Sequence, residues 1–226
     1  MDTGHLLGSG RSADVYALDD SWVLRRYRAA ADTTPELAVM SYLAAFGFPV
    51  PRIGPPAEGA GPGDLVLQRL TGPTMAEALT AGSLDARQGG EMIAGLLREL
   101  HALPPRVSPD PEVRILHLDL HPENVMLTGH GPVVIDWSNT TEGPPGMDRA
   151  MSALILAQLS RTPGFPAAEG VGILFNALMI AMAGDGGITD EELAGAAAHR
   201  AADPCLPAAE HAVLDEAKAL VAAYGR

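Results

Sequence analysis

The sequence is 226 residues long, 47% hydrophobic and only 4% aromatic, so it can bury a core built mainly from aliphatic side chains. Its net charge of −13 argues against nucleic acid or an anionic membrane as a partner. The single cysteine, Cys205, excludes an internal disulfide, and the first residues lack the pattern of a secretory signal. Because the longest apolar run is also too short to span a bilayer, we expect a cytoplasmic protein.

The first seventy residues are predicted to be rich in β-structure. Apolar residues on both sides of a Gly/Ser turn indicate two strands, and residues 22–27 indicate a third. Thr34 can cap a helix that continues through Pro35 and ends at Gly47. A loop rich in Pro and Gly follows, with one short strand, and residues 64–70 form the last predicted strand of this part.

Helices dominate the prediction from residue 71 onward. Thr74-Met75-Ala76-Glu77 has the pattern of a capping box, and residues 189–192 repeat it. Apolar residues at helical spacing predict a helix around residues 93–100, and a hairpin is predicted around residues 128–132. Four further helices are predicted, at residues 148–159, 167–183, 190–200 and 208–224.

This order of elements predicts an α+β fold with two lobes and a cleft between them. The N-terminal lobe, residues 1–70, is β-rich with one helix, and the C-terminal lobe, residues 71–226, is mostly helical. The first lobe has 6 cations and 8 acids, whereas the second has 9 cations and 20 acids. The second lobe therefore suits a cationic molecule, although an acidic surface that serves only solubility is the simpler explanation.

The stretch from His117 to Asn124, HLDLHPEN, carries the strongest chemical signal. Asp119 precedes Asn124 by five residues, and Asp136 ends an apolar run twelve residues later. Transfer of a γ-phosphoryl group needs one carboxylate that orients a hydroxyl and takes its proton, which is the role expected of Asp119. Asn124 and Asp136 supply the amide and carboxylate oxygens that hold Mg²⁺ on a nucleotide. The pattern therefore predicts a small-molecule phosphotransferase.

His117 and His121 flank Asp119 in an H-x-D-x-H pattern that also occurs among metallohydrolase ligands. That interpretation needs further His or Asp ligands, and it leaves Asn124 without a role. We favour a structural role for both histidines, in which their ring nitrogens bond backbone carbonyls and fix the loop.

The turn from Gly8 to Ser12 can lay backbone N–H groups over phosphates. Arg25 on the following strand can contact the phosphates, and Glu36 on the next helix can pair with it. The simpler alternatives are an ordinary hairpin turn, a surface arginine and a first-turn glutamate. The nucleotide contacts expected in the turn are Ser9, Gly10 and Ser12.

HLDLHPEN followed by VVIDW resembles the aminoglycoside phosphotransferase family, also called the choline/aminoglycoside kinase-like group. The resemblance runs in order along nearly the whole chain, since LGSGRSADVYAL looks like its glycine loop and WVLRRY like its phosphate-contacting strand. It implies a protein-kinase-like bilobal fold, ATP and Mg²⁺ as cofactors, and a phosphate-side ion pair between Arg25 and Glu36. It also implies adenine contacts near Gln68 and Leu70, and a capping role for Asp148 at the next helix.

The sequence departs from the family pattern at three positions. Arg25 stands where the family often has lysine, and arginine differs in shape and donor geometry. Leu118 stands where glycine is common, and Ala13 replaces the third glycine of the loop. The chain is also short for the family, which implies trimmed substrate-binding helices.

The sequence thus predicts a monomeric, ATP-dependent O-phosphotransferase for a small hydroxylated cation such as an aminoglycoside, with a role in antibiotic resistance. A kinase for an amino alcohol, a fructosamine or a sugar is the alternative, and a catalytically weak nucleotide-binding protein is a third. Substrate contacts are expected in the last hundred residues. The acidic candidates there are Glu142, Asp185, Asp190, Glu191 and Glu192.

Overall fold

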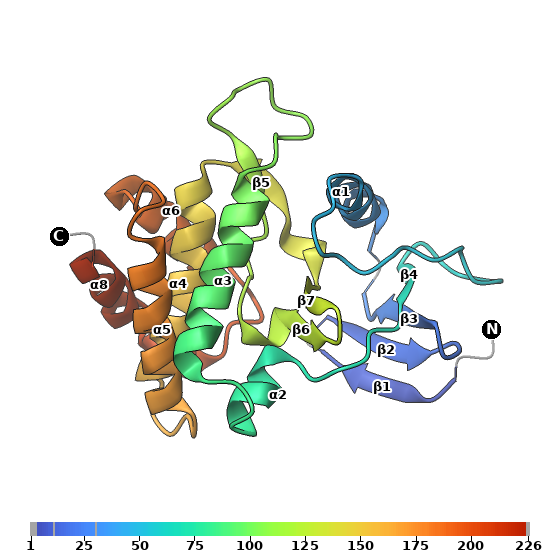
Figure 1. Ribbon diagram of the computed structural model, residues 1–226, viewed down its shortest axis with the longest axis horizontal. Helices are drawn as coiled ribbons and strands as arrows, with labels where there is room; N and C mark the ends of the chain where they lie inside the picture. Colours follow the sequence, from blue (N-terminus) through green and yellow to red (C-terminus); the bar gives the residue numbers. More distant parts are fainter. Residues whose placement is uncertain (1–3, 11, 30, 225–226) are drawn as a thin grey trace. The chain divides into compact units, whose positions relative to one another are not determined.

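The computed structural model describes residues 4–10, 12–29 and 31–224 (Figure 1). Its internal contacts divide the chain into two compact units. Unit 1 comprises the residues up to Gly72 together with Met126–Ser138, and unit 2 comprises Pro73–Val125 and the residues from Asn139 onward. The contacts of the hairpin segment 126–138 group it with unit 1, whereas the predicted boundary after residue 70 assigns it to the second lobe. The functional roles of the two predicted lobes stay a prediction.

Unit 1 contains a four-stranded antiparallel sheet in the order β1-β2-β3-β4. In β3, Leu24 is fully buried, and Arg25 lies opposite Val15 on one side and Leu65 on the other. Strand β3, one of the two central strands, therefore places the charged side chain of Arg25 in the interior of the unit. The strands are β1 (Leu6–Ser9), β2 (Ala13–Ala17), β3 (Trp22–Tyr27) and β4 (Asp64–Gln68).

The helix of unit 1, α1 (Thr34–Ala45), buries Met40 and Leu43. The predicted capping role of Thr34 is wrong, because the helix already includes this residue. Thr33 precedes the helix but does not cap it either, since its hydroxyl donates to the carbonyl of Pro62 at 3.1 Å. The carboxylate of Asp32 accepts the N–H of Thr34 at 2.9 Å instead.

The predicted hairpin is present as β6 (Val125–Thr128) and β7 (Gly131–Val134). The N–H of Val134 donates to the carbonyl of Pro49 at 2.9 Å, which ties β7 to the rest of unit 1. Gly72 has a φ of 136°, and a Cβ there would lie 2.0 Å from the carbonyl oxygen of Leu127. Only glycine allows this close approach of the two backbones. Asp136 follows the hairpin and precedes a 3₁₀ turn, η2 (Trp137–Asn139).

Unit 2 is largely helical, and its core consists of aliphatic side chains such as Ile93, Leu97 and Leu154. Helix α3 lies beside α5, and α4 lies beside α5, α6 and α8 (Figure 1). Both predicted capping boxes are confirmed. The α-helices are α2 (Met75–Thr80), α3 (Ala86–His101), α4 (Pro145–Arg161), α5 (Ala168–Met182), α6 (Asp190–Ala201), α7 (Ala208–Ala212) and α8 (Leu214–Tyr224).

Two predicted helix boundaries differ from the structure. Helix α4 starts at Pro145, three residues before the predicted start, because proline is tolerated in a first turn whose N–H groups have no helical partner. The last predicted helix is divided at Val213 into α7 and α8. A short strand β8 (Thr141–Gly143), which was not predicted, pairs with β5 (Arg114–Leu116). The predicted α+β class, with an antiparallel sheet followed by helices, is confirmed.

Candidate active site

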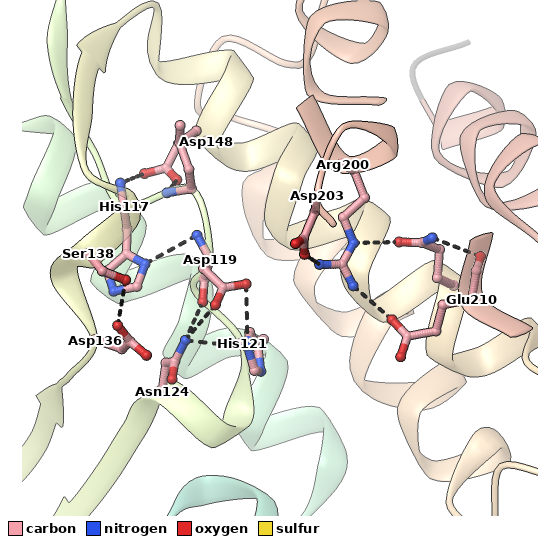
Figure 2. A network of polar contacts seen from close by, with 12 residues as sticks. His117, Asp119, His121, Asn124, Asp136, Ser138, Asp148, Arg200, Asp203 and Glu210 are labelled. Atoms are coloured by element: carbon pink, nitrogen blue, oxygen red, sulfur yellow. Dashed lines mark hydrogen bonds and ion pairs between the residues drawn. The ribbon is translucent and has the colours of Figure 1, made fainter. Parts of the chain in front are cut away.

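The loop that carries Asp119 is closed by the side chain of Asn124. Its amide Nδ2 donates to the carbonyl of Asp119 at 2.8 Å and to the carboxylate Oδ2 of the same residue at 3.1 Å (Figure 2). The 3₁₀ turn η1 (Pro122–Asn124) brings the amide back to the aspartate. Among the described residues, none donates to Oδ1 of Asn124, so this oxygen is available to a ligand.

The carboxylate of Asp119 is held in its ionised form. Burial raises its pKa, but the hydrogen bond and charge of His121 and the charge of His117 outweigh burial, and the pKa lies below the ordinary value of 3.8. The Nε2 atom of His121 lies 3.5 Å from Oδ1 of Asp119. A carboxylate that is charged at neutral pH and only a quarter exposed is suited to accept a hydrogen bond from a hydroxyl and to orient it.

The residue before the aspartate has a backbone conformation that side chains disfavour. Leu118 has a φ of 60°, which explains why a glycine is common at this position in the resembling family. Its side chain is nevertheless buried. The N–H of Leu118 donates to Oδ1 of Asp148 at 2.7 Å, and the N–H of His117 donates to Oδ2 at 3.0 Å. These two bonds hold the disfavoured conformation in place.

Asp148 is therefore not the helix cap that the resemblance implied. It lies inside the first turns of α4, is fully buried, and directs its carboxylate at the catalytic loop (Figure 2). The Nε2 atom of His101, at the end of α3, lies 3.0 Å from Oδ2 of Asp148. Burial raises the pKa of Asp148, but His101 and the backbone N–H groups outweigh burial and lower it. The buried carboxylate thus links α3, α4 and the loop.

His117 and His121 both contact the loop that carries Asp119, and their predicted bonds to backbone carbonyls stay a prediction. Nδ1 of His117 accepts the backbone N–H of Asp119 at 3.2 Å. His121 contacts the carboxylate of Asp119 and lies 3.3 Å from Nδ2 of Asn124. Among the described residues, no group of three or more His, Cys, Asp and Glu side chains is arranged to hold a metal ion.

A second buried polar group of unit 2 involves α6 and α7. Nε of Arg200 donates to Oε1 of Gln158 at 2.9 Å, and Nη2 donates to Oε2 of Glu210 at 2.8 Å (Figure 2). The amide of Gln158 donates in turn to the backbone carbonyl of Glu210 at 2.9 Å. All three side chains are buried, and the charge of Arg200 contributes a minor part of the lowered pKa of Asp119.

In unit 1, Arg25 joins two carboxylates from different segments. Nη1 donates to Oε1 of Glu36 at 2.6 Å, and Nη2 donates to Oδ1 of Asp136 at 2.5 Å. Burial lowers the pKa of Arg25, but the charges of Asp136 and Glu36 outweigh burial and raise it. The hydroxyl of Tyr27 donates to the second oxygen of Glu36 at 2.7 Å, and the guanidinium lies 4.9 Å from the centre of the Tyr27 ring. The predicted pairing of Arg25 with Glu36 is thus present.

The glycine turn is held by side-chain contacts of its own. The hydroxyl of Ser9 donates to Oδ1 of Asp14 at 2.7 Å and accepts from Arg28 at 2.5 Å. The N–H of Gly10 donates to the carbonyl of Ala13 at 2.9 Å, and the carbonyl of Ser12 accepts the N–H of Arg28. Arg11 lies outside the described residues. The hydroxyl of Ser9 and the N–H of Gly10 are therefore engaged within the turn, and their predicted phosphate contacts stay a prediction.

Gln68 and Leu70 lie at the end of β4 and directly after it. The side-chain oxygen of Gln68 accepts the backbone N–H of Arg52 at 3.3 Å and its Nε–H at 3.2 Å. Leu70 is half-buried. The predicted adenine contacts concern the backbone near these residues, and they stay a prediction.

The sequence model of the phosphotransferase enzyme family, APH, matches residues 3–114 and 107–174. The chain belongs to this family. The enzyme is thus a small-molecule phosphotransferase that acts on hydroxyl groups. A search of curated protein sequences found no match. No helix of the described residues is long and apolar enough to cross a membrane.

Solved structures of other phosphotransferases share the fold of this family member. Aminoglycoside phosphotransferase APH(3'')-Id from Streptomyces rimosus is 17% identical, with a TM-score of 0.58 and coverage of 95% of this chain and 92% of that one. The streptomycin–ATP–APH(2'')-IIa ternary complex is 12% identical, with a TM-score of 0.57 and coverage of 96% and 86%. A choline/ethanolamine kinase family protein from Mesorhizobium loti is 18% identical, with a TM-score of 0.55 and coverage of 98% and 88%.

Several acids that were predicted to contact a cationic substrate have structural partners in this phosphotransferase. The carboxylate of Glu142 accepts the backbone N–H groups of three consecutive residues, Arg106, Val107 and Ser108, at 2.6–2.8 Å. Asp185 pairs with Arg98 at 3.0 Å, and Glu192 belongs to a capping box. Asp190 and Glu191 lie in the first turn of α6.

Three residues that contact the candidate carboxylates were not predicted from the sequence. His101 and Tyr27 orient carboxylates, and Ser138 donates to Oδ1 of Asp136 at 2.8 Å. The predicted helix around residues 93–100 ends just before His101, so the sequence indicated its place at a helix end but not its partner. Neither Tyr27 nor Ser138 stands out by spacing, because each acts on a carboxylate that only the folded chain brings within reach.

Proposed function

We propose that this phosphotransferase transfers the γ-phosphate of ATP to a hydroxyl group of a small cationic molecule, with an aminoglycoside as the favoured class. The observation that carries the proposal is the ionised carboxylate of Asp119, which Asn124 and Asp148 hold in a defined loop. The charge of residues 71–226 supports a cationic acceptor, because this part of the chain holds 20 acids against 9 cations. The streptomycin complex among the similar structures supports the same class.

In the proposed reaction, Asp119 accepts a hydrogen bond from the attacking hydroxyl and then takes its proton. The hydroxyl oxygen forms a bond to the γ-phosphorus while the bond to the oxygen bridging the β- and γ-phosphates breaks, and ADP leaves. Arg25 has five N–H donors, of which two bond Glu36 and Asp136, so it retains donors for phosphate oxygens. No side chain forms a covalent intermediate.

The residues present fit the Mg²⁺ ion that this chemistry uses. Oδ1 of Asn124 and Oδ2 of Asp136 accept no hydrogen bond from the described residues, and both are hard oxygen donors. We propose them as the metal ligands. When bound, the ion screens the charge of the phosphates.

A kinase for a small metabolite such as an amino alcohol, a fructosamine or a sugar is the second candidate. It is supported by the fold shared with the choline/ethanolamine kinase family protein. Glu142 and Asp185 also have partners within the chain, so the case for contacts between a cationic aminoglycoside and these two acids is weaker. ATP binding without turnover on any acceptor is the outcome that would favour the third alternative, a catalytically weak nucleotide-binding protein.

The test is ADP release with Mg²⁺ and ATP over a panel of aminoglycosides, amino alcohols, fructosamines and sugars, with mass spectrometry to detect the phosphorylated product. Asp119→Asn is expected to lower turnover by about 100-fold or more and to leave ATP binding intact. Asp110→Asn, which changes an exposed aspartate of unit 2, is the matched control. Intact transfer by the Asp119→Asn variant would refute the assigned base.

A further inference from the structure

The carboxylate of Asp136 is held on one side only. Its Oδ1 accepts from Nη2 of Arg25 at 2.5 Å and from the hydroxyl of Ser138 at 2.8 Å (Figure 2 shows the latter). One carboxylate oxygen has about two acceptor positions, so these two donors fill Oδ1. Oδ2 accepts from none of the described residues, and a third of the side chain is exposed. The aspartate thus presents one free oxygen.

The backbone fixes the position of this side chain, and the contact with Arg25 limits rotation of its carboxylate. Asp136 has a φ of 61°, and the 3₁₀ turn η2 follows it directly. Arg25 is itself fixed, because its other terminal nitrogen bonds Glu36 and its plane lies over the ring of Tyr27. Glu36 is fixed in turn by the hydroxyl of Tyr27 and the backbone N–H of Trp137. Turning Oδ1 of Asp136 toward a ligand would break its hydrogen bonds with Arg25 and Ser138.

We propose that Arg25 and Ser138 restrict Asp136 to coordination through a single oxygen, and that this restriction makes the nucleotide site select Mg²⁺ over Ca²⁺. The inference rests on the proposed function, since it assumes that Asp136 is a ligand of the nucleotide-bound ion. Mg²⁺ is small and octahedral, keeps several waters and needs few protein oxygens. Ca²⁺ takes six to eight oxygens and is often bound by both oxygens of one carboxylate. Asp136 cannot bind it in this way while its Oδ1 accepts hydrogen bonds from Arg25 and Ser138.

This role gives a reason for arginine at the position where the resembling family often has lysine. The planar guanidinium has two terminal nitrogens that bond Glu36 and Asp136 at the same time. A lysine ammonium is a point charge on a flexible stem, and it fixes the orientation of two carboxylates less rigidly. Arg25 and Ser138 act here as positioning residues, because they work through Asp136.

The experiment measures binding of a non-hydrolysable ATP analogue by calorimetry, once with Mg²⁺ and once with Ca²⁺. The wild type is expected to bind the analogue more tightly with Mg²⁺. Ser138→Ala is expected to reduce the ratio of the two affinities by about threefold, and Arg25→Lys by about tenfold. Ser138→Thr, which retains the hydroxyl, is expected to retain the ratio. Ser41→Ala, which removes an exposed hydroxyl from α1 of the same unit, is the matched control.

The outcomes separate the inference from the proposed function. An unchanged ratio in both Ser138→Ala and Arg25→Lys overturns the inference, and so does a wild type that binds the analogue equally with both ions. Absence of analogue binding by the wild type with either ion overturns the proposed function and the inference with it. If Arg25→Lys fails to fold, Ser138→Ala decides, because Ser138 is exposed and its loss leaves the buried ion pair in place.

Discussion

Asp148 accepts the backbone N–H of Leu118 at 2.7 Å, at a residue whose φ of 60° disfavours a side chain. A fully buried carboxylate in α4 therefore holds the backbone one residue before Asp119, the proposed catalytic base. The same carboxylate accepts the N–H of His117 and contacts His101. We therefore expect this one side chain to couple the stability of the fold to the proposed role of Asp119.

Replacement of Asp148 by asparagine is expected to impair both properties. The new NH₂ group faces backbone N–H donors or His101, so at least one buried donor loses its acceptor. We expect unfolding free energy to fall by about 2–4 kcal/mol and turnover to fall by about 100-fold, since the loop shifts around Asp119. Urea unfolding and steady-state kinetics measure the two effects. Asp215→Asn, at an exposed position of α8, is the control, and unchanged turnover in Asp148→Asn would argue against the coupling.

The stabilisation by Asp148 is expected to depend on pH at the acidic end. Its pKa is lowered in the folded state, so the stabilisation is present above the ordinary value of 3.8 and is lost as pH falls through the folded pKa. The difference in unfolding free energy between wild type and Asp148→Asn is therefore expected to be constant from about pH 7 to 5 and to shrink below about pH 4. Urea titrations at a series of pH values measure it. A free-energy difference that grows on acidification would contradict the expected direction of the pKa shift of Asp148.

Leu118 allows the backbone strain to be separated from side-chain packing. Leu118→Ala and Leu118→Gly both remove the buried side chain, but only glycine adopts a positive φ without strain. We expect the glycine variant to be more stable than the alanine variant by about 1 kcal/mol in thermal or urea unfolding. At Leu120, which is also buried but lacks a positive φ, the same pair of substitutions is expected to give the opposite order. If the glycine and alanine variants had the same order of stability at both positions, backbone strain at Leu118 would be contradicted.

Glu142 is expected to affect stability without affecting the acceptor. Its carboxylate accepts three consecutive backbone N–H groups, which hold its pKa below the usual value although burial raises it. Glu142→Gln is expected to lower unfolding free energy by about 1–3 kcal/mol and to leave the KM for the acceptor unchanged. Glu112→Gln, an exposed glutamate of unit 2, is the control. A raised KM at unchanged stability would restore Glu142 as a substrate contact.

Local patterns predicted the elements because they depend on near neighbours in the chain. The spacing of Ile93, Leu96, Leu97 and Leu100 predicts one buried face of a helix, and α3 has that face. The two capping boxes depend on residues three apart, and both are present. The predicted capping role of Thr34 failed, because α1 begins at this residue and the carboxylate of Asp32 accepts its N–H.

The sequence by itself determined the reaction class, because the order of Asp119, Asn124 and Asp136 is a property of the linear chain. It also determined the α+β class through hydrophobic periodicity. Only the tertiary structure decided what surrounds those groups: Asp148 supports the loop, Glu142 holds backbone N–H groups, and Arg25 joins two carboxylates. The reason is physical, since a charged group can be buried only beside partners that compensate it, and these lie up to 111 residues apart in the chain.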